Sequence, residues 1–136
     1  MVKIILITHG DMAGAMLDTA SKICPFEKES VDIFTVSGKV NLKEMSLQLK
    51  DKIDLAGTLI MVDVFGGTSC NLSAEIAHDM ENVNVICGLN LNMLLTAISY
   101  RDKLSASDLA KKVSQDGVKS ILNVTEKLNE HNNGKN

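Results

Sequence analysis

The 136-residue sequence is poor in aromatic side chains, with no tryptophan, one tyrosine and three phenylalanines. It has one proline and three cysteines, and an odd number of cysteines without CxxC spacing argues against a disulfide framework and favours free thiols. No apolar run approaches the roughly 20 residues of a membrane-spanning helix, and no leader-like segment precedes the first apolar stretch. We therefore expect a soluble, cytoplasmic protein.

An excess of one charge is also lacking. The 17 acidic and 14 basic residues are spread along the chain and give a net charge of -3. This balance argues against nucleic acid or an anionic membrane as a partner and leaves proteins and small molecules. Hydrophobic residues make up 45% of the chain, enough for one aliphatic core. We expect a single domain over residues 1–124, followed by a C-terminal tail over residues 125–136.

Four short apolar stretches have the composition or the alternation that is typical of strands, at residues 3–9, 31–36, 58–62 and 83–88. Stretches with the three- and four-residue spacing of amphipathic helices lie between and after them, at residues 11–24, 41–53, 68–80, 91–100 and 107–116. Strands that alternate with helices of about 10 to 15 residues build parallel βαβ units. The predicted fold class is α/β, a doubly wound, mostly parallel sheet of about four strands.

The C-terminal part of the sequence is less regular. Residues 118–124 fit a strand or a helix, and Gly117 before them is a typical helix stop. We interpret this segment as a C-terminal edge strand, and residues 131–136 as a disordered tail. Such a strand has an apolar side and few charges, so it needs a partner, because an unpaired edge promotes aggregation.

The first strand ends on a histidine, in the sequence Thr8-His9-Gly10, and the third ends on a carboxylate, Asp63. In an open parallel sheet the carboxyl ends of the strands form the edge where ligands bind, so we expect His9 and Asp63 to meet there. A carboxylate that accepts one imidazole N–H fixes the tautomer and leaves the other ring nitrogen as a nucleophile. Gly10 allows a tight turn beside the imidazole.

A glycine-rich turn follows Asp63. The sequence Gly66-Gly67-Thr68-Ser69 joins the third strand to a helix, and such a turn directs backbone N–H groups and a hydroxyl at an anion. We expect Thr68 or Ser69 to cap the helix. A nucleophilic imidazole, an orienting carboxylate and an anion cradle together indicate phosphoryl transfer through a phosphohistidine.

Each of these features also has an ordinary structural explanation, and only their convergence on one sheet edge favours a function. His78 and His131 lie in polar surroundings and are interpreted as solvated. No second histidine is placed to activate Cys70, so we interpret it as a packing residue. A metal site of His9, Asp63 and Cys70 would lack an obvious fourth ligand, and we expect neither a metal nor a cofactor.

The two motifs resemble those of a known family, the enzyme IIA components of the mannose, fructose and sorbose type in the bacterial sugar phosphotransferase system. Thr8-His9-Gly10 is similar to the family's phosphorylation site, and residues 62–68, Val-Asp-Val-Phe-Gly-Gly-Thr, are similar to its second active-site segment. The resemblance covers residues 1–124. It implies a phosphotransferase that accepts a phosphoryl group on His9 from the histidine-containing phosphocarrier protein and passes it to a histidine of a IIB subunit.

The resemblance also implies roles for single residues. Asp63 would hold the other imidazole nitrogen of His9, and Thr68, where relatives often have serine, would bind the phosphoryl oxygens. Ser69 is a departure from the family, because relatives often have proline there. The implied catalytic residues are His9, Asp63 and Thr68, and the implied phosphoryl-binding residues are Gly10, Gly66, Gly67, Thr68 and Ser69.

An assembly is implied as well. In the family the terminal strand is exchanged between two subunits as an antiparallel edge strand, and we expect the same symmetric homodimer from residues 117–124. Some relatives carry a fused IIB domain, whereas this sequence ends before one, so IIB is expected to be a separate protein. The membrane permease components would be indirect partners, and because they chiefly determine specificity, the sequence does not name the sugar.

Other functions stay open. A response-regulator receiver would be phosphorylated on Asp63, although a receiver needs an acidic pair after its first strand, where this chain has Thr8-His9, and a lysine after a fifth parallel strand. The phosphocarrier subunit of dihydroxyacetone kinase has a similar first-strand histidine but differs after the third strand. A binding module without chemistry is the remaining alternative.

Overall fold

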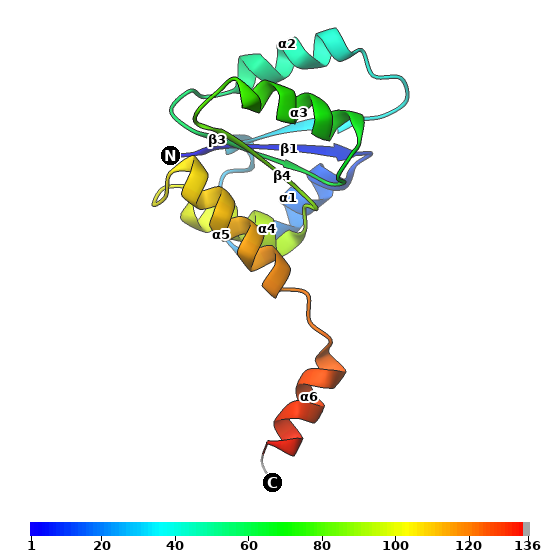
Figure 1. Cartoon of the computed structure of the whole chain (residues 1–136), viewed down its shortest axis with the longest axis vertical. Helices are drawn as coiled ribbons and strands as arrows, with labels where there is room; N and C mark the ends of the chain where they lie inside the picture. Colours follow the sequence, from blue (N-terminus) through cyan, green and yellow to red (C-terminus); the bar gives the residue numbers. More distant parts are fainter. Residues whose placement is uncertain (135–136) are drawn as a thin grey trace.

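The computed structural model describes residues 1–134 of the chain. Its elements are, in order, β1 (Lys3–His9), α1 (Met12–Ile23), the 3-10 turn η1 (Lys28–Ser30), β2 (Val31–Val36), α2 (Leu42–Lys52), β3 (Thr58–Val62), α3 (Thr68–His78), β4 (Val83–Cys87), α4 (Leu91–Tyr100), α5 (Ala106–Lys119) and α6 (Val124–Asn133). The sheet lies between two layers of helices, and α6 projects away from this body (Figure 1). Within residues 1–134, no helix has the length and apolar character that crossing a membrane requires.

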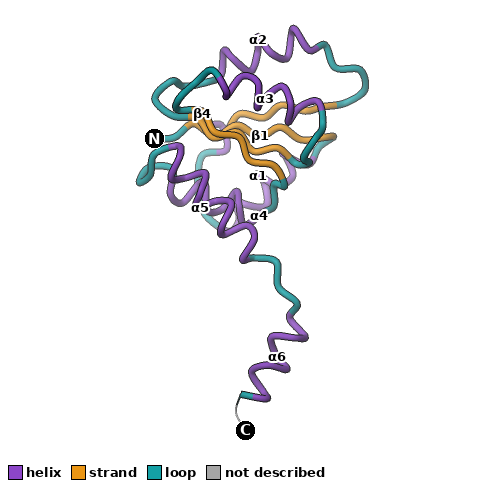
Figure 2. The backbone as a smooth tube through the Cα atoms, in the orientation of Figure 1, coloured by secondary structure: helices purple, strands orange, loops and turns teal. Residues whose placement is uncertain are grey.

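The sheet has four parallel strands in the order β2-β1-β3-β4. Helix α1, which follows β1, packs on one face, whereas α3, which follows β3, packs on the other, as the layers in Figure 2 show. The helices of the two central strands therefore leave in opposite directions, and the crevice between the ends of β1 and β3 is the switch point of a doubly wound sheet. The predicted α/β class and its four parallel strands are confirmed.

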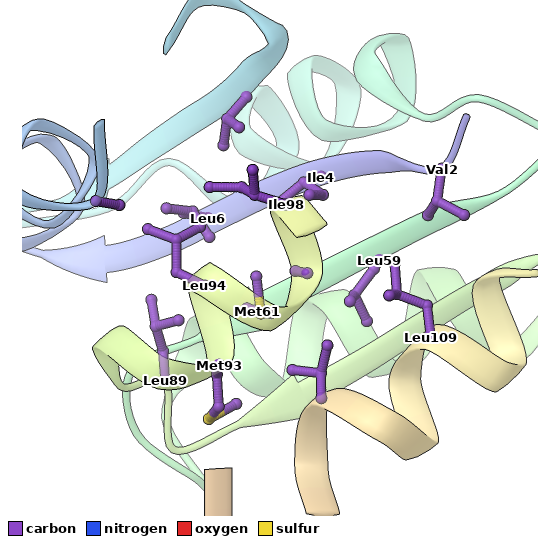
Figure 3. Close-up of a cluster of buried hydrophobic side chains, with 14 of the residues drawn as sticks. Val2, Ile4, Leu6, Leu59, Met61, Leu89, Met93, Leu94, Ile98 and Leu109 are labelled. Atoms are coloured by element: carbon purple, nitrogen blue, oxygen red, sulfur yellow. The ribbon is translucent and has the colours of Figure 1, made fainter. Parts of the chain in front are cut away.

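Two aliphatic clusters cover the two faces of the sheet. Ile4 and Leu6 of β1 pack against α1, α4 and α5 in the cluster of Figure 3, which we call the α1-side core. Ile5 and Ile7 pack against α2 and α3 in a second cluster, the α2-side core. Because β1 and β3 are buried on both faces, they read as continuous apolar runs, and each fully buried side chain contributes about 1.5–3 kcal/mol.

The observed starts of some helices agree with those predicted from the sequence, and the starts of others differ. Asn41, the first residue of the predicted stretch 41–53, caps α2, its side chain accepting a hydrogen bond from the Glu44 N–H at 3.2 Å. Helix α5 is capped by Ser105, two residues before residue 107, where the predicted helical stretch begins. Gly67 is the N-cap of α3 without a side-chain bond, so the prediction that Thr68 or Ser69 caps this helix was wrong.

The prediction that Gly117 ends a helix was also wrong, since α5 continues to Lys119. Gly117 is buried and lies against α4, where an added Cβ would be 2.5 Å from the Cγ of Met93. Asn90, the cap of α4, also approaches Gly117, donating a hydrogen bond to its carbonyl at 3.4 Å. This glycine therefore serves the close packing of two helices rather than a turn.

A pair of glycine substitutions tests this explanation. Gly117→Ala should lower the free energy of unfolding by about 1–3 kcal/mol, because Met93 has to move inside a packed core. Gly14→Ala, at a helical position of α1 with no atom within 4 Å of the added Cβ, should raise it by about 0.5–1 kcal/mol. Urea unfolding of both variants measures the difference. Equal stability of the two would contradict a packing role for Gly117.

The predicted edge strand at residues 118–124 is not formed in this chain. Val118 and Lys119 complete α5, residues 120–123 are irregular, and α6 begins at Val124. The segment leads away from the sheet (Figure 1), so no strand is beside it to complete a ladder of hydrogen bonds. The predicted tail also differs, because residues 131–133 belong to α6, while residues 135–136 lie outside the described part.

Candidate active site

The end of β1 is built to present His9. Residues Ile4 to Thr8 are buried, His9 is the last residue of the strand, and Gly10 turns the chain at a φ of 57°. The Thr8 hydroxyl accepts a hydrogen bond from the Ala13 N–H at 3.0 Å, which ties the first turn of α1 to the strand. The position of His9 is therefore determined by a rigid strand and an anchored helix.

His9 and Asp63 meet at the switch point. The backbone N–H of His9 donates to Oδ2 of Asp63 at 2.8 Å, and ring atom Nδ1 lies 2.9 Å from the same oxygen. An ionised carboxylate only accepts hydrogen bonds, so Nδ1 carries the proton and Nε2 carries the lone pair. The His9 side chain is 58% exposed and that of Asp63 is 9% exposed. The histidine thus faces solvent, and the carboxylate holds it from behind.

The Asp63 carboxylate is stabilised in its charged form. Burial raises the pKa of Asp63, but hydrogen bonds from the backbone and ring of His9 and from the Val64 N–H outweigh it, so that the pKa lies below its ordinary value. The Val64 N–H donates to the second oxygen, Oδ1, at 2.9 Å. Three N–H groups therefore converge on one carboxylate, which is ionised at neutral pH.

This arrangement predicts a stability change in acid. Because the pKa of Asp63 is lower in the folded than in the unfolded protein, its contribution is complete above the ordinary value of 3.8 and is lost as the pH falls through the folded value. The stability advantage of the wild type over Asp63→Asn should be full at about pH 6 and smaller at about pH 2.5, which lies below the ordinary value. Urea unfolding at both pH values measures it. An advantage that does not change with pH would contradict an ionised Asp63.

The glycine-rich turn places the start of α3 at the same edge of the sheet as His9. Gly66 has a φ of 82°, Gly67 caps the helix, and the Asn71 N–H makes the first helical bond, to the Gly67 carbonyl at 3.0 Å. The N–H groups of the first turn, at Thr68, Ser69 and Cys70, have no helical carbonyl to bond. With the helix dipole they form a region of positive potential suited to an anion.

A surface cavity of about 360 Å³ joins His9 to this helix start. Besides His9 it is lined by Thr68 and Ser69 and by residues that the sequence analysis did not select, namely Val36, Ser37, Gly38, Val40 and Leu42. The missed residues run from the last residue of β2, the neighbour of β1, to the first residue of α2. A Ser-Gly pair after a strand was the available signal, but only the strand order shows that it lies beside His9.

Other predicted site residues lie apart from the cavity. Gly10, Gly66 and Gly67 do not line it, and the Gly10 N–H donates to the Val36 carbonyl at 3.3 Å, which makes it unavailable to an anion in this conformation. Gly10 instead determines the turn after His9. His78 and His131 are exposed at the ends of α3 and α6.

A protein-family model described as "PTS system fructose IIA component" matches residues 3–114. The chain belongs to this family. The predicted membership in the mannose-type IIA components is thereby confirmed.

Known relatives of this IIA component agree in sequence and in structure. The PTS system fructose-specific EIIA component of Bacillus subtilis is 30% identical over 131 residues, which cover 94% of this chain and 90% of the relative. The mannose-specific EIIAB component of Escherichia coli is 31% identical over 128 residues, covering 88% of this chain but 39% of that longer relative. A crystal structure of the EIIA component from Streptococcus agalactiae superimposes with a TM-score of 0.84 at 25% identity, covering 93% and 99% of the two chains.

Proposed function

We propose that this IIA component is a cytoplasmic phosphoryl carrier of a sugar phosphotransferase system, with Nε2 of His9 as the atom that carries the phosphoryl group. The observation that supports it most directly is the pair of bonds between His9 and Asp63, 2.8 and 2.9 Å long, on an imidazole that stays 58% exposed. One ring nitrogen is oriented by a buried carboxylate, and the other faces solvent at the switch point. This is the arrangement of an activated nucleophile.

The transfer step needs no proton removal from the attacking nitrogen. The lone pair of Nε2 attacks the phosphorus of a donor phosphohistidine, and the P–N bond of the donor breaks as the new one forms. The His9 ring keeps its Nδ1 proton and gains positive character, which the negative charge of Asp63 offsets at 2.9 Å. Transfer from His9 to the next histidine uses the same geometry, so Asp63 assists both the uptake and the release of the phosphoryl group.

Binding of the phosphoryl oxygens is assigned to the start of α3. Thr68 is an exposed residue and Ser69 a buried one, and both line the cavity that His9 lines. Their backbone N–H groups belong to the first helical turn, where N–H groups have no helical partner. Donors positioned before the reaction stabilise a loose phosphoryl transition state without covalent chemistry.

Exposed apolar side chains beside the site favour proteins as donor and acceptor. Phe65 is 88% exposed and Val64 is 51% exposed, and both directly follow Asp63. Met12 is also exposed, in the first turn of α1 after His9 and Gly10. We assign this surface to the histidine-containing phosphocarrier protein and to a IIB component, which both have to place a histidine over His9, and membrane permease components would be reached only indirectly.

Phosphorylation of Asp63, as in a receiver domain, is less compatible with the geometry. Asp63 is 9% exposed and its two oxygens accept three N–H groups, so that a phosphoryl donor would have to displace His9 first. The match to a fructose IIA family model over residues 3–114 favours a sugar system over the dihydroxyacetone kinase subunit.

Intact-mass measurement tests the proposed function. The protein is incubated with phosphoenolpyruvate, the first enzyme of the system and the phosphocarrier protein, and we expect the mass of one phosphoryl group to be added. Adding a IIB component should remove it again. No added mass would support a binding module instead, and a group mapped to Asp63 would support the receiver.

The segment after α5 is the basis of a prediction that the protein forms a homodimer. Within residues 1–134, β4 pairs with β3 alone, and a groove of about 510 Å³ lies along β4 between α3 and α5. Ile121 and Leu122 are exposed on the segment that leaves the body. We propose that residues 120–124 of a second copy pair with β4 as an antiparallel edge strand, which would cover apolar surface in both subunits.

Sedimentation of two truncated chains measures this. Deleting residues 121–136 should yield a monomer, because it removes four of the five pairing residues and leaves α5 intact. Deleting residues 127–136, a matched control that keeps the segment and shortens α6, should leave the dimer. A full-length monomer, or a dimer in both deletions, would disprove strand exchange.

A further inference from the structure

Two cysteines lie directly behind the candidate active site. Cys70 is in the first turn of α3, next to Ser69, and Cys87 is the last residue of β4. Both side chains belong to the α2-side core, so they point to the same face of the sheet. In the register of the sheet Cys87 lies opposite Val62, the residue before Asp63. The pair therefore joins the phosphoryl-binding turn to the strand beside Asp63.

The two sulfur atoms are close enough to bond. Sγ of Cys70 lies 2.7 Å from Sγ of Cys87, and both thiols are free. A disulfide has its sulfurs about 2.05 Å apart, so its formation needs a movement well below the length of a bond. Cys24, the third cysteine, follows α1 and packs against the α1-side core on the opposite face.

In the single chain this pair lies beside the groove along β4, where Cys87 is partly exposed and Cys70 is buried. Cys70 and Cys87 both line the groove of about 510 Å³ along β4, together with Phe65 and Lys111. Burial, the hydrogen bond with Cys70 and the charge of Asp63 raise the pKa of Cys87 to about 12, so its thiol stays protonated at neutral pH. Cys87 is then the second sulfur to react rather than the first.

We propose that Cys70 and Cys87 are a reversible redox site, which hydrogen peroxide converts to an intrachain disulfide that restrains the phosphoryl-binding turn. The Cys70 thiolate attacks one peroxide oxygen, the O–O bond breaks, and hydroxide leaves with the proton lost by Cys70, giving a sulfenic acid and water. The sulfur of Cys87 displaces the hydroxyl of the sulfenic acid, which leaves as a second water with the Cys87 proton. The sulfur pair loses two electrons and the peroxide gains them. An external dithiol reverses the bond.

The consequence for transfer rests on the proposed function. Thr68 and Ser69 immediately precede Cys70, so drawing Cys70 towards β4 moves their hydroxyls and N–H groups relative to His9. Displacement of positioning groups by up to about 1 Å costs up to roughly a hundredfold in rate. The movement needed here is smaller, and we expect the oxidised protein to accept phosphoryl groups about tenfold more slowly.

Peroxide treatment of the full chain tests the site without any partner protein. Intact mass should fall by two hydrogen atoms, peptide mapping should join Cys70 to Cys87, and thiols titrated in denaturant should fall from three to one. Dithiothreitol should restore all three, whereas methionine oxidation would persist. Cys70→Ser should prevent the bond and Cys24→Ser, the matched control, should not. Three titratable thiols after peroxide, or a bond that involves Cys24, would overturn the proposal.

Phosphoryl uptake of the reduced, oxidised and re-reduced protein tests the restraint. The rate should fall about tenfold on oxidation, recover with dithiothreitol, and be insensitive to peroxide in Cys70→Ser. Equal rates in the reduced and oxidised protein would overturn the restraint. Absence of uptake in every state would instead refute the proposed function, while the mapped disulfide would still stand.

Discussion

Replacing His9 by alanine is expected to abolish phosphoryl uptake from the phosphocarrier protein while leaving the fold nearly unchanged. The imidazole is 58% exposed and its hydrogen bond goes to Asp63 alone. In the variant the backbone N–H groups of residue 9 and of Val64 still bond the carboxylate, so Asp63 keeps two of its three donors. Intact mass after incubation with phosphoenolpyruvate measures uptake, and thermal unfolding measures the fold.

The control for this prediction is another exposed histidine. His78→Ala, at the far end of α3, should take up phosphoryl groups like the wild type. The wild-type label should be labile in acid and stable in alkali, as the P–N bond of a phosphoramidate is. A phosphate ester on Thr68 or Ser69 would be stable in acid and too stable to pass on. A label that persists in His9→Ala would refute the assignment, and its location on Asp63 would restore the receiver alternative.

The sequence predicted the sheet because its strands are buried on both faces. In a chain of this length, a continuous apolar run such as residues 58–62 fits few structures other than a strand buried on both faces. Helices between such strands connect them as parallel neighbours. The meeting of His9 and Asp63 followed from the same rule, because parallel strands bring their carboxyl ends to one edge. Residues at strand ends could therefore be located without knowing any distance.

Features that depend on a neighbour could not be predicted. Gly117 looks like a helix stop by itself, and only the packing of Met93 shows why a glycine is needed inside α5. Residues 118–124 have a composition that fits a strand, but strand formation also needs an available edge, which the sequence does not show. Ser37 and Gly38 line the cavity because β2, which precedes them, lies beside β1, and this strand order could not be known from the sequence. The thiol pair was missed because 17 positions separate its two cysteines in the sequence.

Asp63 has two functions in this structure, one in the backbone and one in the chemistry. Its carboxylate accepts hydrogen bonds from the backbone N–H groups of His9 and Val64. These bonds hold the end of β1 beside the turn that follows β3. It also accepts the ring N–H of His9, which determines the tautomer. A substitution that keeps the shape of the side chain but removes one acceptor oxygen can separate these functions.

Asp63→Asn is expected to slow phosphoryl uptake by about 10²–10⁴-fold, the range of effects seen when a group that assists or positions a reacting side chain is lost. Three N–H groups point at two oxygens, and an amide has one oxygen and one NH₂ group. If the NH₂ faces His9, it forces the ring proton onto Nε2 and removes the attacking lone pair. If it faces Val64, the turn that leads to Thr68 is displaced. Either orientation also removes the negative charge that stabilises the phosphorylated ring.

Rates of uptake and nitrogen NMR of the imidazole together decide between these outcomes. In the wild type the proton should be on Nδ1, bonded to Asp63, whereas an NH₂ group facing the ring in Asp63→Asn moves it to Nε2. Asp79→Asn, at the exposed end of α3, should change neither the rate nor the spectrum. Asp63→Ala has no NH₂ group to force the tautomer, so its rate should equal or exceed that of Asp63→Asn when the tautomer dominates, and fall below it when positioning dominates. Wild-type rates in both Asp63 variants would show that this carboxylate only closes the turn, and the transfer mechanism assigned to it would then be wrong.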